Sequence, residues 1–190
     1  MNSKKNFLAL FDLDGTLFDT SEVNYLAYKY ALELHGDFLI DKEYYIKNCN
    51  GNNYKKYLPN IIRSNDISLI EKIHNTKKEC YSKYLYAAKK NIHLFEIIKV
   101  LKPSYYIGIV TTASHKNTMD ILSHFQVEAF FDLIITHEDI KSVKPNPEGF
   151  LSAMEYFHIS PENTIIFEDS DIGLEAALAS KAATVKVEYF

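Results

Sequence analysis

This chain of 190 residues has few cysteines and no excess of positive charge. The two cysteines, Cys49 and Cys80, lie far apart and form no CxxC pair, which argues against a disulfide framework and against a structural zinc site. The 21 basic and 25 acidic residues give a net charge of −4. We therefore expect neither nucleic acid nor an anionic membrane surface as a partner, because both need a basic footprint.

Long hydrophobic segments are also absent from the sequence. The longest apolar runs, such as Phe7–Phe11 and Ile107–Val110, fall far below the roughly 18 residues that a membrane-spanning helix needs. The lysines near the start could open a secretion signal, but Asp12 and Asp14 interrupt the apolar run too early. We therefore predict a cytoplasmic protein, in keeping with the sparse use of cysteine.

The chain does contain enough apolar material for a folded core. Hydrophobic residues make up 47% and charged residues 24% of the sequence, as in ordinary globular proteins. This composition excludes a disordered protein, because burial of the apolar side chains can offset the entropy lost on folding. At roughly 100–200 residues per domain, the length allows one domain, or one domain with a modest insertion.

Short apolar runs alternate with helical patterns along most of the chain. This alternation predicts an α/β fold, with a parallel sheet flanked by helices. The expected strands are near-continuous apolar runs, as in strands covered on both faces. They are Phe7–Phe11, Tyr105–Val110, Leu133–Thr136, Thr164–Phe167 and Ala183–Val187, and the expected helices are 93–101, 115–124, 148–157 and 172–180.

Residues 19–91 have a different pattern, with no convincing strand and with two helical faces that begin at Val23 and Ile70. A crossover between parallel strands needs far fewer residues than this segment has. We therefore predict an all-helical subdomain at 19–91, inserted into an α/β core formed by 1–18 and 92–190. The two linkers are expected near 16–20 and 88–92.

Two carboxylates, Asp12 and Asp14, follow directly on the first apolar run. Ligands of open α/β sheets bind at the carboxyl ends of the strands, so this pair is a candidate site. A strand that ends in an Asp-Gly turn is the alternative. A calcium loop is excluded, because its fifth and sixth positions need Asp or Asn and then Gly, where this chain has Thr16 and Leu17.

Hydroxyl groups and a lysine follow two further segments. Thr111 and Thr112 end an apolar run just before a predicted helix, where hydroxyls and free backbone N–H groups suit a phosphate oxygen. Taken alone, helix capping by Thr112 or Ser114 explains this segment better. Pro145 holds Lys144 in an extended conformation, and a lysine fixed by such a loop can be aimed, although most lysines are solvated.

A second acidic pair, Glu168 and Asp169, follows the fourth predicted strand. Adjacent acids gain nothing structurally there, whereas a hard cation needs such oxygen ligands. Asp171, by contrast, is explained by capping of the next helix. One edge of the sheet thus collects two acidic pairs, hydroxyls and a lysine. This inventory suits a phosphoryl group, with carboxylates for Mg²⁺ and with a cation and hydroxyls for the phosphate oxygens.

The order of these segments resembles the haloacid dehalogenase-like superfamily. The segments are DLDGT at residues 12–16, an apolar run that ends in Thr111, Lys144-Pro145, and EDS at residues 168–170. The resemblance covers nearly the whole chain and is greatest to the phosphatase and β-phosphoglucomutase-like branch. It implies a Rossmann-like parallel sheet core with helices on both faces, an inserted helical cap subdomain, and Mg²⁺-dependent phosphoryl transfer.

By this resemblance, Asp12 is the nucleophile that forms an aspartyl-phosphate, and Asp14 is the general acid and base. The Mg²⁺ ion would bind the Asp12 carboxylate, the backbone carbonyl of Asp14 and the Asp169 carboxylate. Glu168 would bind the same ion, directly or through a water molecule.

The resemblance also assigns Thr111, Thr112 and Lys144 to binding of the phosphoryl group. It implies a phosphatase for a small cytosolic phosphomonoester, such as a sugar phosphate or a phosphoglycolate-like compound. A β-phosphoglucomutase-like phosphomutase is the alternative, but those mutases carry a histidine at the cap hinge where this chain has Asn24. A catalytically silent binding module is a third hypothesis, against which the intact acids and lysine weigh. The oligomeric state and the substrate are not readable from the sequence.

Overall fold

The computed structural model describes residues 5–188 and divides them into two compact units. Residues 5–19 and 89–188 form the first unit, and residues 20–88 form the second. The chain therefore passes between the units twice, once after Asp19 and once after Ala88.

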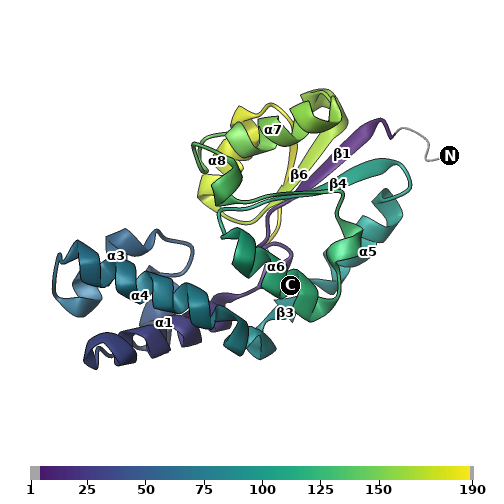
Figure 1. The fold of residues 1–190 in the computed structure, drawn as a ribbon. Coiled ribbons are helices and arrows are strands. Elements are labelled where there is room, and N and C mark those ends of the chain that lie inside the picture. Colours follow the sequence, from purple (N-terminus) through teal and green to yellow (C-terminus); the bar gives the residue numbers. More distant parts are fainter. Residues whose placement is uncertain (1–4, 189–190) are drawn as a thin grey trace. The chain divides into compact units, whose positions relative to one another are not determined.

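The first unit is built on a parallel sheet of five strands: β1 (Phe7–Phe11), β4 (Tyr105–Val110), β5 (Leu133–Ile135), β6 (Thr164–Glu168) and β7 (Ala183–Lys186). Their order is β5-β4-β1-β6-β7, and Figure 1 labels β1, β4 and β6 of this sheet. The central strand β1 pairs with β4 and β6, so that Leu10 lies beside Gly108 on one side and Ile166 on the other. Because the strands are parallel, the residues that follow β1, β4 and β6 meet at one edge of the sheet.

Helices cover both faces of this sheet. The helices α5 (Ile92–Leu101) and α6 (His115–Phe125) lie on one face, and α7 (Glu148–Phe157) and α8 (Asp171–Ala179) lie on the other (Figure 1). Short 3-10 turns are η2 (Glu128–Phe130), η3 (His137–Asp139) and η4 (Pro161–Asn163). Leu10 and Ile166 are fully buried against Phe150 of α7 and Ala176 of α8. Each such aliphatic side chain stabilises the fold by roughly 1.5–3 kcal/mol.

The predicted fold class is confirmed. β1 and β4 have the predicted bounds, and the other three strands differ from the prediction by one residue at the carboxyl end. The four helices of this unit begin and end within one residue of the predicted positions. This agreement follows from the burial of the strands on both faces, which leaves continuous apolar runs in the sequence.

The two linkers pair with each other, which the sequence did not predict. β2 (Phe18–Asp19) and β3 (Lys89–Lys90) form a short antiparallel sheet, with Phe18 opposite Lys90. The backbone N–H of Asn91 also donates to the carbonyl of Leu17 (2.9 Å). Two-residue strands are too short to produce an alternating pattern, so the sequence carries no signal for them.

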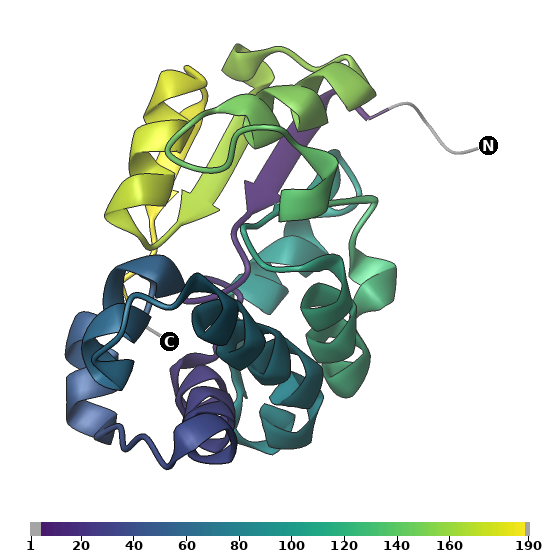
Figure 2. The same ribbon diagram turned by 60° about the vertical axis from the view of Figure 1, so that its left-hand side comes forward.

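The second unit is helical, with α1 (Ser21–Gly36), α2 (Lys42–Asn48), α3 (Tyr54–Ile62), α4 (Ile67–Cys80) and the 3-10 helix η1 (Tyr81–Ala87) (Figure 2). Its core gathers aromatic and aliphatic side chains, among them Tyr28, Leu32, Leu58 and Ile73. Cys49 and Cys80 are both buried, free thiols in this unit. No helix in residues 5–188 combines the length and the apolar character that crossing a membrane requires.

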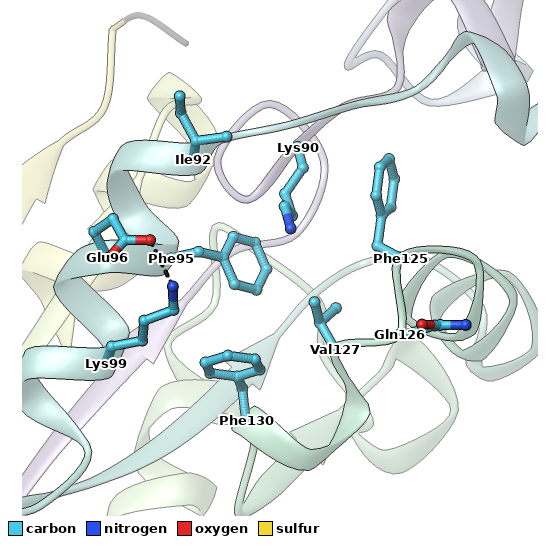
Figure 3. A pocket seen from close by; sticks show the side chains of 9 residues that line it. All are labelled: Lys90, Ile92, Phe95, Glu96, Lys99, Phe125, Gln126, Val127 and Phe130. Atoms are coloured by element: carbon cyan, nitrogen blue, oxygen red, sulfur yellow. Dashed lines mark hydrogen bonds and ion pairs between the residues drawn. The ribbon is translucent and has the colours of Figure 1, made fainter.

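A hollow of about 250 Å³ lies in the first unit between α5, the end of α6 and η2 (Figure 3). Phe95, Phe125 and Phe130 line it, and the side chain of Lys90 points into it between the rings of Phe95 and Phe125 (Figure 3). Phe95 meets Phe130 edge to face at 5.7 Å. Its described lining includes none of the predicted site residues, so we attribute it to the packing of these rings.

Candidate active site

Asp12 lies at the carboxyl end of β1. Its backbone N–H donates to the carbonyl of Phe167 on the neighbouring strand β6 (3.0 Å). The Asp12 side chain is almost fully buried, which is costly for a carboxylate without a partner of opposite charge. Lys144 is that partner, because its Nζ lies 2.5 Å from Asp12 Oδ1.

Lys144 reaches the site from the loop between β5 and α7. Glu148, in the first turn of α7, holds this loop by accepting from the backbone N–H groups of Lys141 (2.8 Å) and Ser142 (2.9 Å). The Lys144 side chain is only 7% exposed, and its Nζ lies 2.6 Å from Glu168 Oε2 as well as near Asp12. The structure therefore brings together three of the predicted site residues, which come from three different segments.

Glu168 and Asp169 follow one another at the end of β6 but have different partners. Glu168 is 1% exposed, and its Oε1 accepts from the backbone N–H (3.2 Å) and the hydroxyl (2.9 Å) of Ser170. Asp169 is half-buried, and its Oδ1 accepts from the hydroxyl of Thr16 (2.8 Å). Each of the two acids thus has its own hydroxyl partner, Ser170 for Glu168 and Thr16 for Asp169.

The loop after β1 approaches Asp169 closely because it contains a glycine. Gly15 has a φ of +91°, and a Cβ atom at this position would lie 2.1 Å from Asp169 Oδ2. Another L-residue would strain the backbone and collide with the carboxylate. Asp14 lies in the same loop and is half-buried. Its backbone forms an isolated parallel β-bridge with Phe18.

The site brings several charged side chains together in a mostly buried place. Burial raises the pKa of Asp12 well above its ordinary value, and the ammonium of Lys144 opposes this effect. Burial also raises the pKa of Asp169, against the hydrogen bond from Thr16. Burial would lower the pKa of Lys144, but the carboxylates of Asp12 and Glu168 outweigh it and raise that pKa, so the amine is charged.

Three carboxylates of this site could hold a metal ion. Asp12, Glu168 and Asp169 each offer an oxygen atom, and these atoms lie within 4.8 Å of one another. Three carboxylates and one ammonium leave an excess of negative charge in a mostly buried place, which a divalent cation would neutralise. Oxygen-only donors suit Mg²⁺ rather than zinc, so the residues present fit a magnesium ion.

The predicted phosphate-binding threonines follow β4, which is next to β1 in the sheet. Thr111 is buried, its N–H donates to the carbonyl of Ile135 (3.0 Å), and its Oγ1 accepts from the N–H of Ala113 (3.0 Å). Thr112 is exposed. Helix α6 is capped by Ser114, which accepts from the N–H of Asn117 (3.3 Å). Of the two candidate capping residues, Ser114 therefore serves the helix and Thr112 does not.

Sequence reasoning assigned no contact to Thr16, Ser170 or Glu148, although each of them holds a site residue or its loop. A signal was present for Ser170, which directly follows the acidic pair that it contacts, but not for Thr16, whose partner Asp169 is 153 positions away. The contact of Glu148 with the backbone of the preceding loop leaves no such signal.

Comparison with known proteins finds relatives that are named phosphatases. A "Phosphorylated carbohydrates phosphatase" of Thermotoga maritima is 26% identical over 174 residues, which cover 88% of this chain and 78% of the relative. The pyrophosphatase PpaX of Bacillus mycoides is 29% identical over 192 residues, covering 95% and 82% of the two chains. The crystal structure of CbbY from Rhodobacter sphaeroides in complex with phosphate has the same fold, with a TM-score of 0.83, 24% identity, and coverage of 96% and 86%.

The family model of haloacid dehalogenase-like hydrolases matches residues 9–187, which is nearly the whole chain. The match includes both acidic pairs and the lysine loop described above. With curated relatives that are named phosphatases, the protein is an enzyme of the hydrolase class. The chain belongs to the haloacid dehalogenase-like hydrolase family.

Proposed function

We propose that the protein is a Mg²⁺-dependent phosphatase that hydrolyses a small phosphomonoester through an aspartyl-phosphate on Asp12. The observation that carries this proposal is the position of Lys144, 2.5 Å from Asp12 and 2.6 Å from Glu168. A carboxylate and a phosphate dianion repel each other, so a buried nucleophilic carboxylate needs a cation beside it. Lys144 supplies that cation where the phosphoryl oxygens would arrive.

Asp12, Asp169 and the backbone carbonyl of Asp14 would hold the Mg²⁺ ion, with Glu168 bound directly or through water. When bound, the ion supplies positive charge that neutralises the phosphoryl oxygens. The support for this assignment is the cluster of carboxylate oxygens within 4.8 Å of one another.

The chain's own residues would carry out the reaction in two steps. First, an Asp12 oxygen bonds to phosphorus while the bond to the leaving oxygen breaks, and Asp14 gives that oxygen a proton. Second, Asp14 takes a proton from water, the water oxygen bonds to phosphorus, and the bond to Asp12 breaks. Inorganic phosphate leaves and Asp12 is regenerated. Thr111, Thr112 and Lys144 hold the phosphoryl oxygens throughout.

The proposed substrate is a small sugar phosphate or a phosphoglycolate-like compound in the cytoplasm. A sugar phosphate is favoured by the relative from Thermotoga maritima, whose name specifies phosphorylated carbohydrates, whereas the name of the Bacillus relative specifies a pyrophosphatase. We further propose that the helical unit, predicted from sequence as residues 19–91, acts as a cap that supplies contacts to the leaving group. A substrate panel should therefore include inorganic pyrophosphate beside the sugar phosphates.

A phosphomutase of the β-phosphoglucomutase type is the second candidate. In this chain the side-chain amide of Asn24 donates to Thr20 Oγ1 (3.2 Å). An amide does not titrate near neutral pH and cannot pass a proton to a sugar, so Asn24 favours net hydrolysis. A silent binding module is disfavoured because Asp12, Asp14, Lys144 and Asp169 are all present.

Release of inorganic phosphate from a panel of phosphomonoesters in the presence of Mg²⁺ tests the proposal. We expect turnover of at least one sugar phosphate, and we expect none with the Asp12→Asn variant. Binding of phosphate compounds without any phosphate release would favour the silent module. Isomerisation without net phosphate release would favour the mutase.

A further inference from the structure

Both carboxylate oxygens of Glu168 are occupied within the protein. Oε2 accepts from Lys144 Nζ (2.6 Å), and Oε1 accepts from the hydroxyl (2.9 Å) and the backbone N–H (3.2 Å) of Ser170. Charge-assisted hydrogen bonds of this kind are among the strongest in proteins. These hydrogen bonds and the burial of Glu168 fix the orientation of its carboxylate toward Lys144.

Helix α8 is built to accept this carboxylate against its first turn. The hydroxyl of Ser170 accepts from the N–H of Gly173 (3.0 Å), so the same group that contacts Glu168 also caps the helix. A Cβ atom at Gly173 would lie 2.0 Å from the carboxylate carbon of Glu168. The carboxylate therefore occupies the space that a side chain at position 173 would need. Within a helix an alanine is otherwise preferred to glycine.

Asp169 is held by a different group. Its Oδ1 accepts from the hydroxyl of Thr16 (2.8 Å), and Thr16 itself is fully buried in the loop after β1. Asp169 is more exposed than Glu168 and is one of the three carboxylates that could hold a metal ion. The two adjacent acids thus have separate hydroxyl partners, from two different segments of the chain.

We propose that Ser170 and Thr16 are positioning residues with separate tasks in the phosphatase site. Ser170, with the space left by Gly173, keeps Glu168 against Lys144 and so places the ammonium that binds the phosphoryl group. Thr16 keeps Asp169 in the orientation that binds the metal ion. This inference rests on the proposed function and deepens it, because it separates phosphate binding from metal binding at the level of single hydroxyl groups.

The test compares Ser170→Ala with Thr16→Val in two equilibrium measurements. The first is the affinity for inorganic phosphate at saturating Mg²⁺, and the second is the affinity for Mg²⁺ alone, both by calorimetry. Loss of a hydrogen bond to a charged group weakens binding by about tenfold. We expect Ser170→Ala to weaken phosphate binding about tenfold and Mg²⁺ binding by less than that, because Glu168 also belongs to the carboxylate cluster, while Thr16→Val weakens Mg²⁺ binding about tenfold.

Three further variants separate positioning from a loss of stability. Ser170→Thr keeps the hydroxyl and should restore phosphate affinity. Asp66→Ala removes the capping side chain of α4, which accepts from the N–H of Leu69 (3.2 Å), and should lower the melting temperature without changing either affinity. Gly173→Ala leaves the capping hydroxyl of Ser170 in place but displaces Glu168, and should reproduce the loss of phosphate affinity. This variant tests the inference even if Ser170→Ala fails to fold.

The inference is overturned if Ser170→Ala and Thr16→Val weaken the two ligands to the same extent, or if Gly173→Ala binds phosphate as the wild type does. Both measurements use binding alone, so they do not depend on turnover. Absence of phosphate release by the wild-type enzyme over the whole panel would contradict the proposed function. Equal effects of the two variants in an active enzyme would contradict only the separate tasks of the two hydroxyls.

Discussion

The rings of Phe11 and Phe167 stack with centroids 4.6 Å apart and an interplanar angle of 5°. The two residues are direct neighbours in the register of β1 and β6, and each one immediately precedes an acidic residue of the site. Asp12 follows Phe11, and Glu168 follows Phe167. The stack therefore lies directly before the two carboxylates that share Lys144.

Truncation of this stack should destabilise the protein strongly. Phe11 is fully buried, and we expect Phe11→Ala to lower the free energy of unfolding by about 3–5 kcal/mol, the usual cost of such a cavity. Phe7 is the matched control, because it lies in β1 like Phe11 and stacks on Tyr105 of β4, but is 40% exposed. Phe7→Ala should cost less than half as much in urea denaturation. Equal losses for the two variants would contradict the central role of the Phe11 stack.

The second prediction concerns the nucleophile. Asp12→Asn keeps the size of the side chain but removes its nucleophilic charge, so phosphate release should fall to background while the far-ultraviolet circular dichroism is unchanged. Asp14→Asn should lower kcat by roughly 10²–10⁴-fold, the contribution of a positioned acid and base. Asp171→Asn is the control, because Asp171 is an exposed first residue of α8 and should leave kcat unchanged. Full activity of Asp12→Asn on a good substrate would disprove the assignment.

The sequence was sufficient to predict the sheet and the segments of the site for one physical reason. Each central strand is buried on both faces, so an apolar run marks its position, and polar residues after the run mark the ligand-binding edge. Asp12, Glu168 and Asp169 are all found by this reasoning. Their mutual distances are not, because the strand pairing that brings β1 beside β6 is a tertiary property.

The contacts that the sequence did not reveal join residues whose pairing no local sequence pattern records. Thr16 contacts Asp169 across 153 positions of the chain, and no local pattern records such a pair. The pairing of Phe18 with Lys90 between the two linkers is equally non-local. The orientation of Lys144 depends on Glu148, whose carboxylate binds backbone N–H groups that any residue would offer.

The third prediction follows from that role of Glu148. Hydrogen bonds from the backbone N–H groups of Lys141 and Ser142 are the main cause of a pKa of Glu148 below its ordinary value of 4.5, while burial opposes them. In the folded state Glu148 therefore binds fewer protons than in the unfolded state. Its stabilising contribution is present above pH 4.5 and is lost as the pH falls through the lowered pKa of the folded state.

We therefore expect Glu148→Gln to be less stable than the wild type at pH 7, with a difference that shrinks below pH 4.5. Urea denaturation of both proteins between pH 3 and pH 7 measures this difference. Glu162→Gln provides a comparison, since the pKa of Glu162 is lowered chiefly by the Ser160 side chain, away from the lysine loop. Only Glu148→Gln should also weaken phosphate binding. A difference between Glu148→Gln and the wild type that grows toward low pH would contradict the prediction.

The fourth prediction concerns the metal ion. Excess EDTA should abolish turnover, and Mg²⁺ should restore it, whereas Ca²⁺ should restore it poorly because of its larger and looser coordination. Mg²⁺ at a hundredfold excess over its dissociation constant should stabilise the protein by about 2.7 kcal/mol. Asp169→Asn should lose most of this stabilisation in a thermal melt, and Asp171→Asn should keep it. Undiminished turnover in excess chelator would contradict a magnesium site.

The last prediction decides between hydrolase and mutase. A mutase must keep water away from the aspartyl-phosphate while its sugar bisphosphate intermediate turns over. The sequence resemblance implies that Asn24 stands where such mutases carry a cap-hinge histidine that takes part in this control. The amide of Asn24 donates to Thr20 Oγ1 (3.2 Å) and has no proton to exchange near neutral pH. In its proposed role as general base, Asp14 would then activate water as soon as the leaving group has departed.

We therefore expect net phosphate release from β-glucose 1-phosphate in the presence of a bisphosphate primer and Mg²⁺, with negligible formation of glucose 6-phosphate. Both products can be followed in one reaction by phosphorus NMR. The Asn24→His variant is the informative companion, because it restores a titratable group at the hinge without altering Asp12 or Asp14. Its ratio of glucose 6-phosphate to free phosphate should rise above that of the wild type. Glucose 6-phosphate that accumulates faster than phosphate in the wild type would establish a mutase instead. Such an enzyme would return the phosphoryl group from Asp12 to the sugar before Asp14 could activate water to hydrolyse the aspartyl-phosphate.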